Sequence, residues 1–214
     1  MSRTLKTDIP GPDRRVTIAD VRAKGFPALF ARDVAEPLRL VLELGFGGGE
    51  TLRALAAAAP GVAHVGVDLS HRRVLKLARR LAKTEERNLR LLEASAQEVV
   101  RDALDDASVS TCWINFPDPW PKKRHHRRRL LQPAFVAALA RRLVPGGELH
   151  AATDHAEYAA QIDAVLAAEP LLENALAAPF VSEVPGRLRT AYEEMWRAEG
   201  RALHFFCYRR RSDA

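Results

Sequence analysis

Short apolar runs alternate along the chain with longer segments whose apolar residues recur at helical spacing. The apolar runs predict buried strands at residues 40–44, 64–68, 89–93, 109–115 and 148–152. The longer segments predict helices at 50–59, 71–83, 130–143 and 156–168, and a helix at 17–35 interrupted near Gly25 and Pro27. Less regular strands are expected at 180–184 and 202–208. This alternation predicts an α/β fold with a mostly parallel sheet flanked by helices.

A glycine-rich loop, GFGGG at residues 45–49, joins the first predicted strand to the helix that follows it. Glycines such as Gly45 and Gly47 let a ligand approach the backbone closely, next to the N–H groups of a helix start. The spacing is G-x-G-x-G, which differs from the dinucleotide pattern G-x-G-x-x-G. An acid, Glu43, precedes the loop. Its carboxylate would repel a pyrophosphate but attract the ammonium and sulfonium groups of S-adenosylmethionine.

Polar groups stand at the ends of the neighbouring predicted strands as well. Asp68 ends the second strand, where an acid can accept two hydrogen bonds from a ribose diol. Ser95 and Ala96 follow the third strand, where an adenine edge would reach the same crevice, and Asp118 follows the fourth. Glu43 alone fits an edge or cap position, and Asp68 alone fits a helix cap. Their order along the chain favours S-adenosylmethionine as the cofactor.

The segment NFPDPWPKKRHHRRR at residues 115–129 concentrates the positive charge of the chain. The chain has 33 Lys and Arg against 27 Asp and Glu, a net charge of +6, and residues 122–129 alone hold six cations and no acid. Prolines at 117, 119 and 121 fix φ, so the segment is predicted to be a stiff loop. Such a patch binds polyanions by counterion release. A solvated charged helix face is the simpler alternative, and the absence of interleaved apolar residues disfavours a membrane surface.

Length and cysteine content limit the remaining possibilities. The 214 residues suit one domain, expected at residues 16–214 after a flexible arm at residues 1–15. Cys112 and Cys207 lie in apolar stretches and lack metal-ligand spacing, so we expect reduced cysteines and no metal site. No window resembles a signal region or a membrane span, which leads us to expect a cytoplasmic protein.

Several stretches together resemble the bacterial tRNA (guanine-N7)-methyltransferase family (TrmB type). They are LELGFGGGETL, GVDLS, FPDPWPKKRHHRRRL, TDH at 153–155 and TAYEE at 190–194, and the resemblance runs from about residue 40 to about residue 200. It implies a Rossmann-like class I S-adenosylmethionine-dependent methyltransferase. The implied reaction is methyl transfer to N7 of the variable-loop guanine, position 46, of tRNA.

The resemblance also assigns individual residues. Glu43, Asp68 and Asp118 match the family's cofactor-contact acids. The positions that match its substrate contacts are Lys122, Asp154, Thr190, Tyr192 and Glu193. Two departures stand out, because Ser95 replaces a frequent acid and Ala191 replaces the lysine of a Thr-Lys-aromatic-Glu motif.

The implied chemistry needs no general base, because guanine N7 has a free lone pair and carries no proton. We therefore expect the catalytic residue, Asp118, to orient the base and stabilise its developing positive charge. Asp154 and Glu193 are expected to accept guanine N–H groups, and Lys122 and Arg128 to contact phosphates. The target base must leave its tertiary pairing. Trp120 either stacks on it or packs under the loop, and His125 and His126 are given no role.

Three other functions compete with this interpretation. The NFPDPW loop is loosely similar to the Asn-Pro-Pro-aromatic loop of amino-methylases, which would suit an rRNA base amine. A non-catalytic RNA-binding subunit would be expected to carry a damaged cofactor loop, whereas this loop is intact. A small-molecule methyltransferase would not need a long basic run beside the reactive carboxylate. The expected partner is tRNA, and the sequence indicates no obligatory protein partner.

Overall fold

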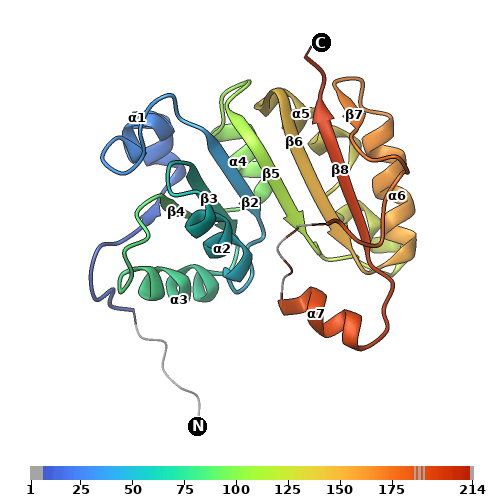
Figure 1. The fold of residues 1–214 in the computed structure, drawn as a ribbon, viewed down its shortest axis with the longest axis horizontal. Helices are drawn as coiled ribbons and strands as arrows, with labels where there is room; N and C mark the ends of the chain where they lie inside the picture. Colours follow the sequence, from blue (N-terminus) through green and yellow to red (C-terminus); the bar gives the residue numbers. More distant parts are fainter. Residues whose placement is uncertain (1–6, 186, 188, 190, 213–214) are drawn as a thin grey trace.

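The computed structural model describes residues 7–185, 187, 189 and 191–212, and it contains an eight-stranded sheet (Figure 1). The strand order is β1-β4-β3-β2-β5-β6-β8-β7. The strands are β1 (Arg15–Val16), β2 (Leu40–Leu44), β3 (Ala63–Asp68), β4 (Leu89–Glu93), β5 (Val109–Asn115), β6 (Leu143–Thr153), β7 (Leu172–Asn174) and β8 (His204–Arg210).

The strands from β1 to β6 are parallel, whereas β8 runs antiparallel between β6 and β7. Every residue of β2 and β3 is buried, as expected for strands covered on both faces. The predicted parallel sheet is therefore confirmed. The carboxyl ends of β2, β3, β4 and β5 meet at one edge, and this edge carries the polar groups singled out above.

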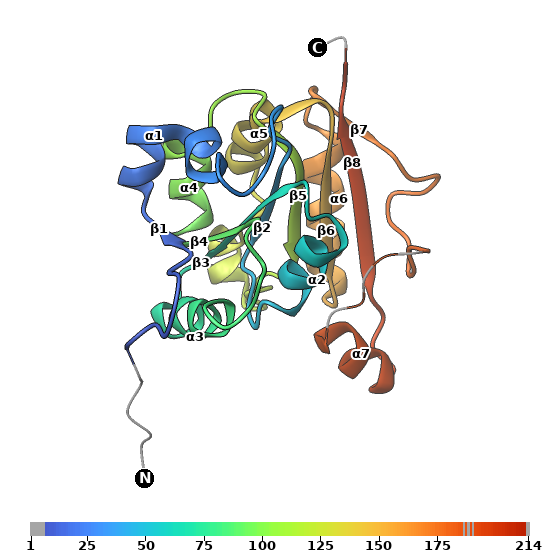
Figure 2. The same ribbon diagram turned by 60° about the vertical axis from the view of Figure 1, so that its left-hand side comes forward.

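Helices cover both faces of the sheet (Figures 1 and 2). One apolar cluster joins the sheet to the first, fourth, fifth and sixth helices, and a second cluster joins it to the second and third. The last helix lies beyond the carboxyl edge of the parallel strands (Figure 1). The helices are α1 (Ile18–Phe30), α2 (Glu50–Ala58), α3 (His71–Leu81), α4 (Ala96–Asp102), α5 (Pro133–Arg142), α6 (Ala156–Ala167) and α7 (Ala191–Ala198).

Several elements differ from the prediction, among them β1 and α7, which were not expected, and β6, which begins at Leu143. Helix α4 was not expected, although Ser95 and Glu98 form a capping box at its start. The basic run contains a 3₁₀ helix, η1 (Lys123–Arg128), so the stiff-loop prediction holds only for the proline-rich half. The expected strand at 180–184 is reduced to one bridge between Val181 and Phe205, and β7 takes the edge instead. Helix α5 begins only at Pro133, which suits a first helical position because it needs no N–H partner.

The segment before β1 lies against α3 where the structure describes it. Arg79 donates to Asp8 Oδ1 at 2.8 Å, and Ile9 packs on the apolar cluster of α2 and α3. Residues 1–6 of the predicted arm lie outside the described residues, and the domain boundary at residue 16 stays a prediction. Both cysteines are free, with Cys112 buried in the core as predicted and Cys207 half-buried. Among the described helices, none is long and apolar enough to cross a bilayer.

Candidate active site

A crevice with two adjoining lobes lies at the carboxyl edge of the parallel strands. The first lobe has a volume of about 470 Å³ and the second about 360 Å³. Both are bordered by Gly45, Arg73 and the segment 115–118. The first lobe is further lined by Asp68, Leu69, Ala96, Gln97, Trp120 and Arg128. The second is further lined by Glu43, Gly47, Glu50, Thr51, Asp154 and Trp196.

The glycine loop forms a wall that both lobes share. Gly45 and Gly47 have φ values of +82° and +58°, a conformation that other residues rarely adopt. A Cβ atom added at either position would meet nothing within 4 Å, so the space beside the loop is open to a ligand. The neighbouring Asp68 is fixed from the other side, because its Oδ1 accepts from the Ser70 N–H at 2.8 Å. These features give the crevice a preformed backbone cradle.

Glu43 carries a buried oxygen that accepts no hydrogen bond from the part of the chain that the structure describes. Its side chain lies in the sheet with only 2% of the residue exposed, and its Oε1 accepts from the Asn115 amide at 3.1 Å. Its Oε2 accepts no hydrogen bond from any described residue. Burial raises the pKa of Glu43 to about 7, against the opposing effects of the Asn115 hydrogen bond and the Arg187 charge. A cationic group in the second lobe would satisfy this oxygen and favour the ionised carboxylate.

The predicted adenine contact at Ser95 has another use in the structure. The Ser95 hydroxyl accepts from the Glu98 N–H at 3.1 Å and lies 2.6 Å from the Glu98 carboxylate, which closes the cap of α4. Ala96 is among the residues that line the first lobe, and the cofactor contact predicted for it stays a prediction. A direct cofactor contact of Ser95 likewise stays a prediction. Gln97, two residues further on, also lines the first lobe.

Asp118 lies at the junction of the two lobes, on the loop that follows β5. The loop leaves the strand through Phe116 at φ +51° and ends at Trp120 at φ +44°, both unusual for residues other than glycine. Within the described part of the chain Asp118 makes no ion pair or hydrogen bond. It is exposed, so its carboxylate faces the crevice without a competing protein partner.

The basic run divides into surface and buried members. Lys122 and Arg128 are exposed, and the Arg128 guanidinium lies over the Trp120 ring at 5.0 Å. Arg129 is only 2% exposed and donates to the Pro119 carbonyl at 2.7 Å and to Gln161 at 2.8 Å. The expectation that residues 122–129 form one polyanion-binding patch therefore does not hold for Arg129, which anchors the loop to α6.

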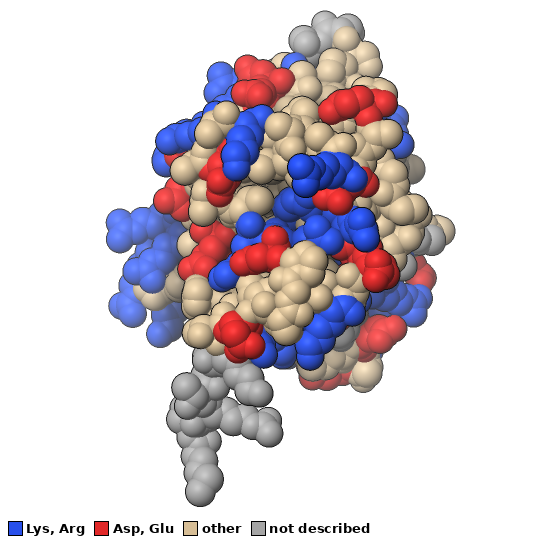
Figure 3. All heavy atoms as spheres, turned by 90° about the vertical axis from the view of Figure 1, so that its left-hand side faces the viewer, with Lys and Arg blue, Asp and Glu red and all other residues tan. Residues whose placement is uncertain are grey.

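One side of the molecule carries charges of both signs. In Figure 3, Lys and Arg side chains lie among Asp and Glu over much of the face that forms the left-hand side of Figure 1. This agrees with the sequence, in which the net positive charge comes from one local run.

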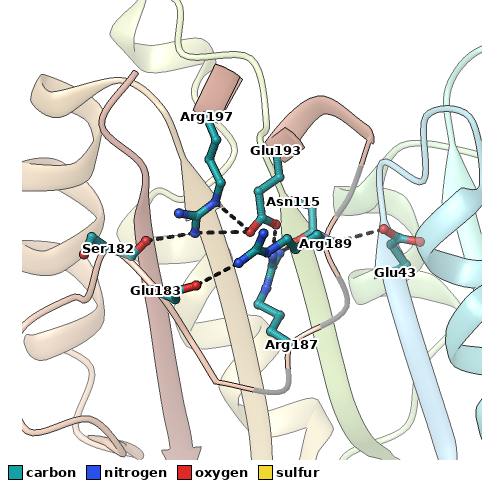
Figure 4. Close-up of polar contacts among 8 residues, drawn as sticks. All are labelled: Glu43, Asn115, Ser182, Glu183, Arg187, Arg189, Glu193 and Arg197. Carbon is teal, nitrogen blue, oxygen red and sulfur yellow. Dashed lines mark hydrogen bonds and ion pairs between the residues drawn. The ribbon is translucent and has the colours of Figure 1, made fainter. Parts of the chain in front are cut away.

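The predicted substrate acids are already paired in this structure. Asp154 lines the second lobe and accepts from Arg201 at 2.9 Å. Glu193 lies at the start of α7, where it is ion-paired with Arg187 and, at 3.4 Å, with Arg197 (Figure 4). Thr190 lies outside the described residues, and so does the side chain of Tyr192. The roles of all four residues stay predictions.

With this geometry in place, the chain can be compared with known proteins. The family model Methyltransf_4, which describes methyltransferases, matches residues 38–206. The tRNA (guanine-N(7)-)-methyltransferase of Halorhodospira halophila is 43% identical over 174 residues, which are 81% of this chain and 75% of that protein. The chain belongs to the tRNA (guanine-N7)-methyltransferase family.

Another member of this family, from Bordetella pertussis, is 52% identical over 134 residues, or 63% of this chain. That match covers 53% of the Bordetella protein, so the chain spans about half the length of this relative. Among solved structures, the 16S rRNA methyltransferase KamB has a TM-score of 0.63 at 16% identity, with 86% of this chain and 93% of that chain covered. The antibiotic-resistance methyltransferase Kmr has a TM-score of 0.55 at 22% identity, covering 92% and 93%. These likenesses confirm the class I methyltransferase fold.

Several side chains at or beside the crevice were not predicted from the sequence, and three of them take part in the polar and aromatic contacts of the second lobe. Asn115 borders both lobes and binds Glu43, Arg187 connects to Asn115, and Trp196 lines the second lobe. Asn115 stands next to the recognised FPDPW motif and ends a strand, which was an available signal. Arg187 comes from the irregular segment before α7, and Trp196 lies on α7, a short helix that the sequence pattern did not predict.

A cluster outside the crevice bears on the prediction that no metal is bound. Donor atoms of Glu148, His150 and Cys207 lie within 4.8 Å of one another on β6 and β8. Glu148 already accepts from Arg209 at 2.9 Å, and its other oxygen lies 3.1 Å from His150. Burial raises the pKa of Cys207 to about 11, so the thiol stays protonated. These contacts explain the cluster without an ion, and the absence of a metal stays a prediction.

Proposed function

We propose that the protein transfers a methyl group from S-adenosylmethionine to N7 of the variable-loop guanine of tRNA, at position 46. The observation that carries the proposal is the position of Asp118, a carboxylate where the two lobes meet that has no ion pair or hydrogen bond with the residues the structure describes. The first lobe suits the nucleoside half of the cofactor, and the second lobe suits its methionine half, so an incoming base would approach Asp118 where the two lobes meet. The activity for which the family members are named supports the choice of acceptor.

The side chains of the crevice fit the proposed cofactor group by group. Asp68 retains acceptor capacity for a ribose diol in the first lobe, beside the apolar wall of Leu69 and Ala96. In the second lobe the unpartnered Oε2 of Glu43 suits the ammonium of a methionine moiety. The open space at Gly45 and Gly47 lets the chain connecting the two halves lie on the backbone. When bound, S-adenosylmethionine supplies an activated methyl group on a sulfonium.

Asp118 is placed to act on the acceptor base. Because N7 carries no proton, the carboxylate has no proton to remove. Its tasks are to align the base and to stabilise the positive charge that develops on the ring. A fixed carboxylate at the junction of the lobes performs both tasks without changing its own protonation state.

The tRNA backbone is the proposed ligand of the exposed cations near the crevice. Lys122 follows Asp118 on the same loop, and Arg128 ends the 3₁₀ helix that comes next, so phosphate contacts there would set the position of the base. Trp120 lines the first lobe, where Arg128 and His125 already contact its ring. This arrangement favours packing of Trp120 as part of the wall of the first lobe over stacking on the extruded guanine.

The proposal is tested by transferring labelled methyl from S-adenosylmethionine to unmodified tRNA and cleaving the product with borohydride and aniline. That chemistry breaks RNA selectively at 7-methylguanosine, so one cut in the variable loop is expected. Label without a cut would overturn the N7 assignment and favour an exocyclic amine acceptor. RNA binding without label would favour a non-catalytic subunit.

A further inference from the structure

Arg187 lies in the middle of a chain of polar contacts that connects β2, β5 and α7 (Figure 4). Its Nη2 donates to Asn115 Oδ1 at 2.6 Å, and the Asn115 amide in turn donates to Glu43 Oε1 at 3.1 Å. Its Nη1 donates to Glu193 Oε2. A single guanidinium therefore contacts Asn115, which orients the Glu43 carboxylate. It also contacts Glu193, which lies in the first turn of α7.

The link is buried, which makes its geometry specific. The side chains of Arg187 and Glu193 are 6% and 3% exposed. The Arg187 guanidinium lies over the Phe205 ring at 4.6 Å and over the Trp113 ring at 5.7 Å. Buried ion pairs are sensitive to the loss of either member, because the remaining charge lacks solvent. Glu193 keeps Arg197 at 3.4 Å if Arg187 is replaced.

The shape of the guanidinium matters as much as its charge. Its separate Nη atoms reach Asn115 and Glu193 at the same time. A lysine ammonium at this position would carry the charge as a single point and would not bridge the two acceptors in the same way. Replacing Arg187 by lysine therefore separates the electrostatic contribution from the bridging contribution.

We propose that Arg187 is a positioning residue that couples the Glu43 carboxylate in the second lobe to helix α7. It does so by holding Asn115 and Glu193 in one arrangement. The inference rests on the proposed function, in which Glu43 faces the cofactor and α7 faces tRNA. Since both ends share one guanidinium, an ionised Glu43 and an ordered α7 support each other. Cofactor binding should accordingly favour tRNA binding, and the reverse.

The polar and titratable groups around Glu43 determine its pKa, which is the quantity that the test follows. Asn115 and Cys112 approach from β5, Glu50 from α2 and Arg187 from the segment before α7. Arg187 lowers the pKa of Glu43 and Glu50 raises it. Burial keeps the Cys112 thiol protonated by raising its pKa. Removal of Arg187 therefore makes ionisation of Glu43 harder, an effect that a purely structural role in α7 would not produce.

The test measures the affinity for S-adenosylmethionine by calorimetry, without tRNA, at pH values on both sides of 7. In the wild type the affinity should weaken below the pKa of Glu43, which is about 7. Arg187→Met should move this midpoint upward and weaken binding at neutral pH by about tenfold, as expected for a shift of about one pH unit. Arg187→Lys should keep the midpoint near that of the wild type but raise the KM for tRNA.

Arg189→Met is the matched control, because Arg189 comes from the same segment and pairs with the exposed Glu183 at 2.8 Å. It should leave the midpoint unchanged. A wild-type midpoint in folded Arg187→Met would overturn the inference. If that variant does not fold, a wild-type KM for tRNA in Arg187→Lys would overturn it instead. A wild type that binds S-adenosylmethionine but does not methylate tRNA would refute the proposed function alone, while the midpoints would still test the link to Glu43.

Discussion

The backbone N–H of Gly47 donates a hydrogen bond to Asp68 Oδ2 at 3.1 Å. The contact joins the glycine loop after β2 to the end of β3, so two loops separated in the sequence form one rigid rim. Arg73, 3.5 Å from the same oxygen, adds a positive charge beside it. The carboxylate is thereby oriented before any ligand arrives, which lowers the entropy cost of binding.

Asp68→Asn should weaken binding of S-adenosylmethionine by roughly tenfold to a hundredfold, the scale of a lost charge-assisted hydrogen bond. The amide also places an NH₂ group against one of the two backbone donors, Gly47 or Ser70. Calorimetric titration of the folded variant measures the effect. Asp105→Asn, at an exposed turn before β5, is the control and should bind like the wild type. Equal affinities for wild type and Asp68→Asn would exclude a ribose contact.

Asp118→Asn should lower kcat by on the order of a hundredfold with saturating tRNA and cofactor, because the charge that stabilises the methylated ring is lost. The loss should persist at alkaline pH, since no proton abstraction is involved. Initial rates across a pH series measure both effects. A wild-type kcat in this variant would refute the proposed role, and recovery at high pH would indicate a base.

Lys122→Ala and Arg128→Ala should each raise the KM for tRNA and lower the salt dependence of log KM by about one unit of slope. The physical reason is that each exposed cation releases about one counterion when it binds a phosphate. Arg87→Ala provides a control, because Arg87 is exposed and precedes β4 at the opposite edge of the sheet. Steady-state rates at several salt concentrations decide the matter. Slopes equal to that of the wild type would place the RNA elsewhere.

A substitution of Arg129 should behave differently from those of its neighbours. Arg129→Met removes the hydrogen bonds to Pro119 and Gln161 from a buried site, so we expect a loss of about 2 kcal/mol in unfolding free energy. Urea unfolding measures this loss. A change in salt slope without a loss of stability would show that Arg129 acts on RNA after all.

The buried position of His64 should lower the free energy of unfolding in acid. Burial lowers its pKa to about 4, whereas the unfolded chain takes up the proton near the ordinary value of 6.5. The folded pKa is depressed, so the contribution of His64 is complete above pH 6.5 and declines as the pH falls toward 4. At about pH 5 the cost is about 2 kcal/mol.

Urea unfolding of wild type and His64→Asn at neutral pH and at about pH 5 isolates this term. The variant should lose less stability on acidification than the wild type. The contribution of Glu43 to stability changes with pH in the opposite direction, because its pKa is raised in the folded state. This contribution is present in acid and is lost as the pH rises toward about 7. It is the same in wild type and His64→Asn, so it cancels in the comparison. An equal acid loss in the two proteins would contradict the assignment to His64.

The sheet and half of the crevice could be predicted because their signals are local. Continuous apolar runs identify buried parallel strands such as β2, and their ends place Glu43, Asp68 and Asp118 at one edge without further information. The short helix α4 escaped because it has only seven residues, although its capping box was visible in the sequence. There the cap pattern, and not the apolar spacing, was the better guide.

The pairing of Glu193 was not predictable for a different reason. Its partner Arg187 belongs to a segment without periodicity, and their contact depends on how α7 returns toward β5. The buried position of Arg129 is similar, because a run of six cations gives no sign of which one turns inward. Such choices are made by tertiary packing, which a single sequence does not display.

The bridge between Val181 and Phe205 allows the segment between these two residues to change in length and sequence. Two backbone hydrogen bonds, at 2.9 and 3.0 Å, hold these residues together, so the segment between them leaves the sheet and returns at nearly the same point. The cost of closing such an excursion changes slowly with its length. Insertions or exchanges of sequence within it can therefore accumulate while β8 keeps its register. Under the proposed function, the acceptor side of the crevice can therefore change in length and sequence as long as Arg187 keeps its contacts with Asn115 and Glu193.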